Sequence, residues 1–121
     1  MARVLIVDDS PTEIHIISTM LERNGYEVLS ATSGEEGVEM ARSQRPDLIL
    51  MDIVMPGLNG FQATRQIARD PQTAGIPVII VSSKGQESDK VWGLRQGAKD
   101  YIVKPVTEPE LLAKVRAVLG G

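Results

Sequence analysis

Five side chains that could act on a charged substrate stand directly after apolar runs of the sequence. They are three aspartates, a serine and a lysine: Asp8, Asp9, Asp52, Ser82 and Lys104. Gathered in one place, the three carboxylates and the one ammonium group would carry a net charge of −2. Two like charges about 4 Å apart repel by about 4 kcal/mol at an effective dielectric near 20, so such a cluster needs protons or a cation.

A hard divalent cation fits these side chains, because every available donor is an oxygen. The chain has no cysteine and one histidine, His15, which we interpret as a solvent-facing helix residue. Oxygen donors without histidine or thiolate favour Mg²⁺ over Zn²⁺, and Mg²⁺ usually binds one or two carboxylates together with substrate phosphate oxygens. The cluster therefore points to phosphoryl chemistry.

Side chains this far apart in the sequence need a fold that brings them to one edge. Five strand-like runs alternate with helical patterns, which indicates parallel strands joined by right-handed crossovers. The runs are Arg3–Val7, Glu27–Ala31, Leu48–Met51, Pro77–Val81 and Asp100–Val103. The stretches LILM and VIIV are apolar throughout, as is typical of central strands covered on both faces. The pattern predicts a doubly wound (βα)₅ sheet, in which ligands bind beyond the carboxyl ends of the strands.

The predicted helices lie between these runs, at Pro11–Asn24, Gly34–Gln44, Phe61–Arg69, Glu87–Gln96 and Glu108–Leu119. Three of their starts have the spacing of a capping box, in which a hydroxyl caps the helix and a glutamate reaches back to the cap residue's own N–H. The pairs are Ser10–Glu13, Ser33–Glu36 and Thr107–Glu110. Left-handed glycines are predicted after three helices, at Gly25, Gly97 and Gly120.

Composition narrows the class of protein. A chain of 121 residues is one domain's worth, and 42% apolar with 24% charged residues excludes wholesale disorder. A net charge of −3 argues against direct binding to nucleic acid. No apolar run approaches a membrane span of about 20 residues and no signal peptide is evident, so we expect a cytoplasmic protein with no membrane insertion.

Four stretches resemble the motif set of bacterial response-regulator receiver domains, the family of the chemotaxis regulator CheY. They are VDD at 7–9, MDIVMPGLNG at 51–60, PVIIVSS at 77–83 and DYIVKP at 100–105. The resemblance covers essentially the whole chain and implies a flavodoxin-like sheet with strand order 2-1-3-4-5. Within the family, MDIVMPGLNGFQATRQ and KGQESDKVWGLRQGAKDY are most similar to stand-alone PilH-type regulators of type IV pilus chemosensory systems.

The resemblance implies a role for each residue at the sheet edge. Asp52 matches the phosphoryl acceptor, a carboxylate that becomes an acyl phosphate. Asp9 matches the direct Mg²⁺ ligand, and Asp8 its partner acting largely through water. The backbone carbonyl of Val54 matches the third protein ligand of the metal.

Four further matches concern the signal and the phosphoryl oxygens. Ser82 matches the hydroxyl that bonds one phosphoryl oxygen, and Lys104 the cation that pairs with another. The Lys104–Pro105 bond matches a peptide that is cis in this family. Tyr101 matches the aromatic that turns inward when the hydroxyl is drawn to the phosphate. Val54 and Lys84 occupy positions that tune how fast the acyl phosphate hydrolyses.

The resemblance also implies an output surface, formed by the helix over 87–96, the strand over 100–103 and the helix over 108–119. Val91, Leu94 and Ala98 are predicted to form the inward stripe of the first of these helices. Trp92 is turned about 100° from Val91, and the pattern leaves open whether it packs at the helix flank or contacts a partner.

The function implied is that of a single receiver domain, residues 1–121, with no output domain. It would accept a phosphoryl group from a CheA-like sensor histidine kinase, catalyse its own phosphorylation and dephosphorylation, and bind a downstream protein target. Two alternatives stay open: a phosphate sink, and a receiver cut from a larger DNA-binding regulator. A flavodoxin-type FMN carrier is disfavoured, because Asp8 and Asp9 would repel its phosphate. A dehalogenase-type phosphatase needs two aspartates spaced by one residue, and these are adjacent.

Overall fold

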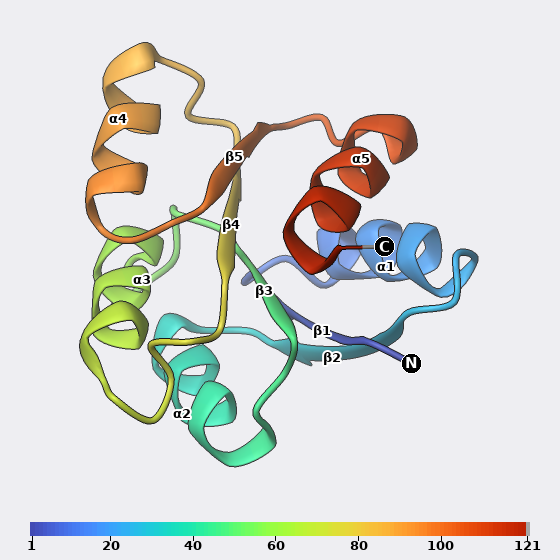
Figure 1. The fold of residues 1–121 in the computed structure, drawn as a ribbon. Coiled ribbons are helices and arrows are strands. Elements are labelled where there is room, and N and C mark those ends of the chain that lie inside the picture. The colour runs from blue at the N-terminus through green and yellow to red at the C-terminus, as the bar shows by residue number, and fades with distance from the viewer. Residues whose placement is uncertain (121) are drawn as a thin grey trace.

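The computed structural model describes residues 1–120, in which five strands alternate with five helices (Figure 1). The strands are β1 (Arg3–Val7), β2 (Glu27–Ala31), β3 (Leu48–Met51), β4 (Val78–Ser82) and β5 (Asp100–Val103). The helices are α1 (Pro11–Glu22), α2 (Gly34–Gln44), α3 (Gly60–Arg69), α4 (Glu87–Arg95) and α5 (Glu108–Leu119).

The strands form one parallel sheet in the order β2-β1-β3-β4-β5, which confirms the predicted topology. Helices α1 and α5 cover one face of the sheet, and α2, α3 and α4 cover the other (Figure 1). The chain direction across the sheet reverses between β1 and β3. Ligand sites in open α/β sheets lie beyond the carboxyl ends of the strands at such a switch point.

Two aliphatic clusters attach the helices to the sheet, and β1 contributes to both. Val4 and Ile6 face the cluster under α1 and α5, whereas Leu5 and Val7 face the cluster under α2 and α3. All four are at most 1% exposed. This alternation, with helices on both faces, explains why the strand is apolar at successive positions.

Element boundaries differ slightly from those predicted. Strand β4 lies one residue later at each end, because Ser82 still pairs with Val103 on β5. Ser82 therefore ends the strand and does not follow it. Helix α1 ends two residues early, at Glu22, since the next amides bond in a tighter turn: Asn24 N–H donates to Leu21 O.

The helix caps were predicted only in part. The hydroxyls of Ser10 and Ser33 accept the N–H groups three residues on, as expected. The reciprocal bonds predicted at Ser10 and Ser33 were wrong. The N–H of Ser10 donates to Asp8 Oδ1, and the carboxylate of Glu36 accepts the N–H of Thr32. Within the described residues, Thr107 makes no side-chain cap bond.

A complete capping box occurs where none was predicted. Asn59 Oδ1 accepts the N–H of Gln62, and Gln62 Oε1 accepts the N–H of Asn59, both at 2.9 Å, at the start of α3. Positive φ values end three helices at the predicted glycines, and α2 ends on Arg45 with φ of 46°. The capping box between Asn59 and Gln62 fixes the start of α3.

The orientation of α4 was predicted wrongly. Val91 and Leu94, expected to point inward, are 42% and 50% exposed, and Trp92 is 48% exposed; only Ala98, just past the helix, is buried. The residue that α4 places against the sheet is Gly93, where a Cβ atom would come within 2.7 Å of Ile80 Cδ1. Contact through a glycine brings the helix backbone close to the sheet, so the bulky side chains lie on its outer side. Val91, Trp92 and Leu94 form what we call the apolar α4 face.

Across the described residues, no helix combines the length and apolar character needed to cross a bilayer.

Candidate functional site

Three carboxylates meet at the carboxyl ends of β1 and β3. The pairing of Val7 with Met51 aligns these strand ends, so Asp8 and Asp52, the residues that follow, lie side by side. Each of Asp8, Asp9 and Asp52 has a carboxylate oxygen within 4.8 Å of the others. Asp8 and Asp52 are 2% and 7% exposed, and Asp9 faces solvent.

Lys104 arrives at this cluster from the end of β5. Its Nζ atom lies 3.0 Å from Asp8 Oδ2 and 3.6 Å from Asp52 Oδ1. Its backbone N–H donates to the carbonyl of Ser82, which fixes the end of β5 beside β4. The Lys104–Pro105 peptide bond is cis. One ammonium group thus contacts two of the three carboxylates.

The surroundings of Asp52 disfavour its ionised form. Burial, together with the charge of Asp8, raises the pKa of Asp52 to about 6, although Lys104 opposes the shift. Burial alone would lower the pKa of Lys104, but the hydrogen bond to Asp8 and the charge of Asp52 together raise it. The single lysine does not neutralise the site, so a further cation would be favoured there.

The donors present fit Mg²⁺. The cluster offers three carboxylates, and no histidine or cysteine belongs to it. Oxygen ligands, with one exposed carboxylate that leaves access for water, are the arrangement that Mg²⁺ prefers in proteins. Val54, whose carbonyl the resemblance assigns to the metal, lies in the exposed loop that follows Asp52 and is 59% exposed.

Ser82 and Tyr101 are linked through the backbone of Lys84. The Ser82 hydroxyl is fully buried and accepts the N–H of Lys84 at 3.2 Å. The Tyr101 hydroxyl donates to the carbonyl of Lys84, and the residue is 5% exposed, so its ring lies inside the protein. The segment that leads from β4 into α4 is therefore held by one bond from each of the two side chains.

Gly60 contributes to the site in a way that the sequence reading missed. In the structure, a Cβ atom on Gly60 would stand 1.9 Å from the carbonyl oxygen of Asp52, and the Gly60 N–H donates to Ile53 O. The loop folds back onto the backbone of Asp52, and only glycine allows that approach. The available signal was a glycine eight residues beyond the aspartate that follows β3.

The comparisons with known proteins agree with this geometry. Residues 4–116 match the model of the response regulator receiver domain. The chain belongs to that family, and the resemblance in its motifs is confirmed.

Among individual proteins, the chain is 62% identical to Protein PilH of Pseudomonas aeruginosa over the full length of both. It is 42% identical to the DNA-binding dual master transcriptional regulator RpaA of a Synechocystis strain, covering 98% of this chain and 49% of that protein.

Solved structures show the same fold. Chemotaxis protein CheY4 of Vibrio cholerae superposes with a TM-score of 0.92 at 33% identity, covering 98% of this chain and 99% of the other. The receiver domain of the sensor histidine kinase PA1611 of Pseudomonas aeruginosa, solved with a magnesium ion in its active-site cleft, gives a TM-score of 0.91 at 32% identity, covering 99% and 98%.

Proposed function

We propose that this chain is a single-domain response regulator that takes a phosphoryl group onto Asp52 from a phosphohistidine of a sensor kinase. The observation that carries the proposal is the juxtaposition of Asp52 with two further carboxylates and with Lys104 Nζ at 3.6 Å. Membership of the receiver family supports the same reaction. The domain extends over residues 1–121 in this proposal.

The first step is attack by a carboxylate oxygen of Asp52 on phosphorus. The new O–P bond forms as the P–N bond of the phosphohistidine breaks, and the imidazole leaves with the bonding pair. With a pKa of about 6, Asp52 is about nine-tenths ionised at pH 7 and so available as a nucleophile. The product is an acyl phosphate.

Two side chains receive the charge of the transferred group. Lys104, already within reach of the carboxylate, pairs with one phosphoryl oxygen, and the Ser82 hydroxyl donates to a second. Mg²⁺, held by Asp8, Asp9, Asp52 and the carbonyl of Val54, supplies positive charge to the phosphoryl oxygens when bound. Positioning and countercharge of this kind account for most of the catalysis in phosphoryl transfer.

Hydrolysis ends the signal. A water molecule attacks the phosphorus, the O–P bond to Asp52 breaks, and the carboxylate and inorganic phosphate result. Val54 and Lys84, both exposed beside the site, border the path of that water. An apolar Val54 offers it no hydrogen bond.

The phosphorylated state is communicated by α4, β5 and α5. Donation from Ser82 to a phosphoryl oxygen pulls on the segment through Lys84, which Tyr101 also holds. The apolar α4 face adjoins that segment and is the contact for a downstream protein target. Similarity to PilH supports a pathway of type IV pili and twitching motility with a CheA-like kinase. In this proposal the protein acts in the cytoplasm, without direct binding to nucleic acid and without insertion into a membrane.

The test is stoichiometric labelling. With Mg²⁺ and acetyl phosphate, intact mass should rise by one phosphoryl group, and Asp52→Asn should show no gain. Acid-labile phosphate on Asp52→Asn at the wild-type level would refute the assignment of the acceptor.

One alternative has a specific observation in its favour. RpaA carries a matching segment in half of its length, so a receiver within a larger DNA-binding regulator is the second candidate. A pull-down from the native organism that returns a longer form of this chain would favour it. Transfer of the phosphoryl group back to the kinase without binding of any target would favour a phosphate sink.

A further inference from the structure

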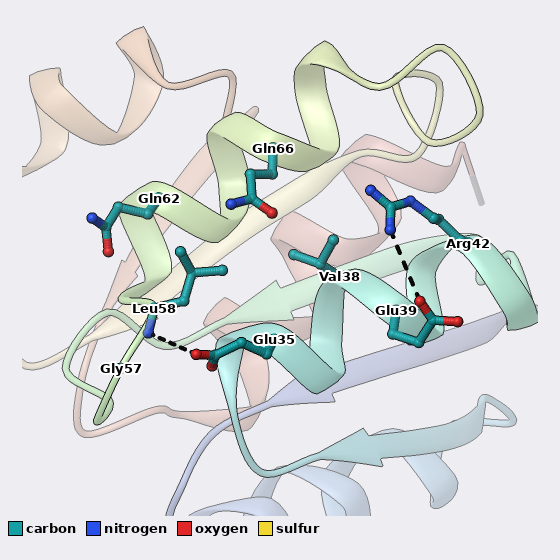
Figure 2. A pocket seen from close by; sticks show the side chains of 8 residues that line it. All are labelled: Glu35, Val38, Glu39, Arg42, Gly57, Leu58, Gln62 and Gln66. Carbon is teal, nitrogen blue, oxygen red and sulfur yellow. Dashed lines mark hydrogen bonds and ion pairs between the residues drawn. The ribbon is translucent and has the colours of Figure 1, made fainter.

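An open groove runs between α2 and α3, at the side of the molecule away from α1 and α5 (Figures 1 and 2). Its volume is about 460 Å³. Two apolar side chains form its floor, and glutamates from α2 and glutamines from α3 line its two sides (Figure 2). These six lining residues are Val38, Leu58, Glu35, Glu39, Gln62 and Gln66.

The floor of the groove belongs to the aliphatic cluster under α2 and α3, but its α2 side is mostly charged. Glu35, Val38, Glu39 and Arg42 stand at the spacing i, i+3, i+4, i+7, which places them in one stripe along α2. Among these four, only Val38 is apolar. The charged side chains of the stripe are exposed to solvent, and the space above the floor stays open.

The charged side chains of this stripe differ in how closely they are paired with opposite charges. Arg42 is engaged by Asp70, with Nε 2.8 Å from Oδ2, and lies 3.9 Å from Glu39. The Glu39 side chain is 70% exposed. With the Arg42–Asp70 pair neutral, Glu35 and Glu39 leave two negative charges on one wall of the groove. Like charges four residues apart disfavour a helix, and a cation placed between them removes that repulsion.

We infer that this groove docks a basic segment of a partner protein, in which lysine or arginine side chains flank an aliphatic one. Glu35 and Glu39 lie one helical turn apart, a rise of about 6 Å, which suits two cationic side chains. The aliphatic side chain packs on Val38 and Leu58. The amides of α3 meet the backbone of the segment. From Glu35 to Arg42 the stripe is about 10 Å long, the length of about three extended residues.

The groove also borders the loop that carries the phosphorylation site. The N–H of Leu58 donates to Glu35 Oε2 at 3.3 Å, and a Cβ on Gly57 would come within 2.8 Å of the same oxygen. A ligand that draws Glu35 toward itself therefore acts on the loop that follows Asp52. This coupling, unlike docking itself, rests on the proposed function; where it operates, phosphorylation changes the affinity of the groove by the same factor that docking changes phosphorylation.

Docking can be tested on the full chain without phosphoryl donor or Mg²⁺, so that failure of the proposed acceptor chemistry leaves the result intact. The probe is a fluorescein-labelled peptide of three Lys-Leu-Ala repeats, with binding followed by anisotropy at low salt. In Glu35→Gln/Glu39→Gln, which keeps the acceptor for Leu58, affinity should fall about tenfold. The control Glu22→Gln/Glu27→Gln changes the net charge equally at exposed positions on α1 and β2 and should stay within about twofold.

Other outcomes overturn the inference. Equal losses in the two double variants would mean attraction to the net negative charge alone. A peptide with glutamate in place of lysine that bound as tightly would mean that the carboxylates of the groove take no part in recognition. If sedimentation instead showed dimers that only Glu35→Gln/Glu39→Gln dissociates, the groove would hold a second copy of this chain and not a basic partner. Amide shifts on peptide addition should centre on Leu58 and Gln66, and shifts centred on α4 would refute the site.

Discussion

Helices α3 and α4 lie side by side on the same face of the sheet but are attached to it differently. Helix α3 buries Ala63 and Ile67 in the aliphatic cluster. Helix α4 approaches the sheet through Gly93 and turns its large apolar side chains to solvent. An element with few buried apolar contacts moves at a low free-energy cost. Helix α3 is therefore firmly attached to the sheet, whereas α4 is the more easily moved of the two.

The largest expected effect is the contrast between a core position on α3 and an apolar position on α4. Ile67→Ala should lower the free energy of unfolding by about 2–5 kcal/mol, because it leaves a cavity in a closed cluster. Leu94→Ala, half exposed, should change it by less than about 0.5 kcal/mol. Urea titrations at pH 7 measure both. Comparable losses would show that α4 is as firmly packed as α3.

One glycine on each of the two helices offers a second contrast between α3 and α4. Gly60→Ala sets a Cβ against the backbone of Asp52 at 1.9 Å, which should cost about 1–3 kcal/mol of stability. Gly93→Ala meets the flexible tip of Ile80 and gains helix propensity, so its net effect should stay within about 1 kcal/mol. Thermal unfolding of the two variants side by side checks the difference. A larger loss of stability for Gly93→Ala than for Gly60→Ala would mean that α4, and not α3, is the more firmly attached helix.

The next largest effect on stability is expected at Asp52. Its pKa is raised from 3.8 to about 6 in the folded protein, so the native state binds more protons than the unfolded chain between these values. Stability from this group is therefore lost as pH rises from about 4 to about 6. Asp52→Asn should be more stable than wild type at pH 7, by about 1–2 kcal/mol without metal, and equal to it near pH 4. Urea denaturation of both proteins at pH 4 and pH 7 measures this difference. If Asp52→Asn were still more stable than wild type at pH 4, the charge of Asp52 would not be the cause.

The smallest expected effect is spectroscopic. Trp92 is the one tryptophan of the chain and lies on the apolar α4 face. Mg²⁺ with beryllofluoride, which mimics a phosphoryl group, should alter its emission or its access to quencher as α4 shifts. The change should vanish in Asp52→Asn and be reduced in Ser82→Ala. An unaltered signal, with beryllofluoride binding shown separately, would mean that α4 is no more movable than α3.

The sequence was most informative where local pattern decides the outcome. Apolar strands such as LILM, flanked by helical periodicity, predicted four strands without error and the fifth, β4, to within one residue. The residues at the strand ends could be collected by topology alone, because parallel strands end at one edge. Asp8, Asp52 and Lys104 do lie together there.

The rest depends on distances between segments that pattern cannot supply. Apolar periodicity assigned Val91 and Leu94 to the inner side of α4, but the helix approaches the sheet through Gly93, where a large side chain would meet Ile80. The closeness of Gly60 to the carbonyl of Asp52 likewise follows from how far a loop folds back. Both depend on how closely two backbone segments approach each other, and the pattern of side chains in the sequence does not reveal that distance.

The ion pair of Lys104 with Asp8 joins residues 96 positions apart in the chain. During synthesis on the ribosome, the three aspartates emerge long before the lysine that pairs with them, and the last strand of the sheet closes the set. Under the proposed chemistry, a chain that lacks β5 would have the three carboxylates without the countercharge of Lys104 and would be a poor phosphoryl acceptor. The ability to accept a phosphoryl group would then arise only once β5 has been made, so the order of the residues couples signalling to completion of the sheet.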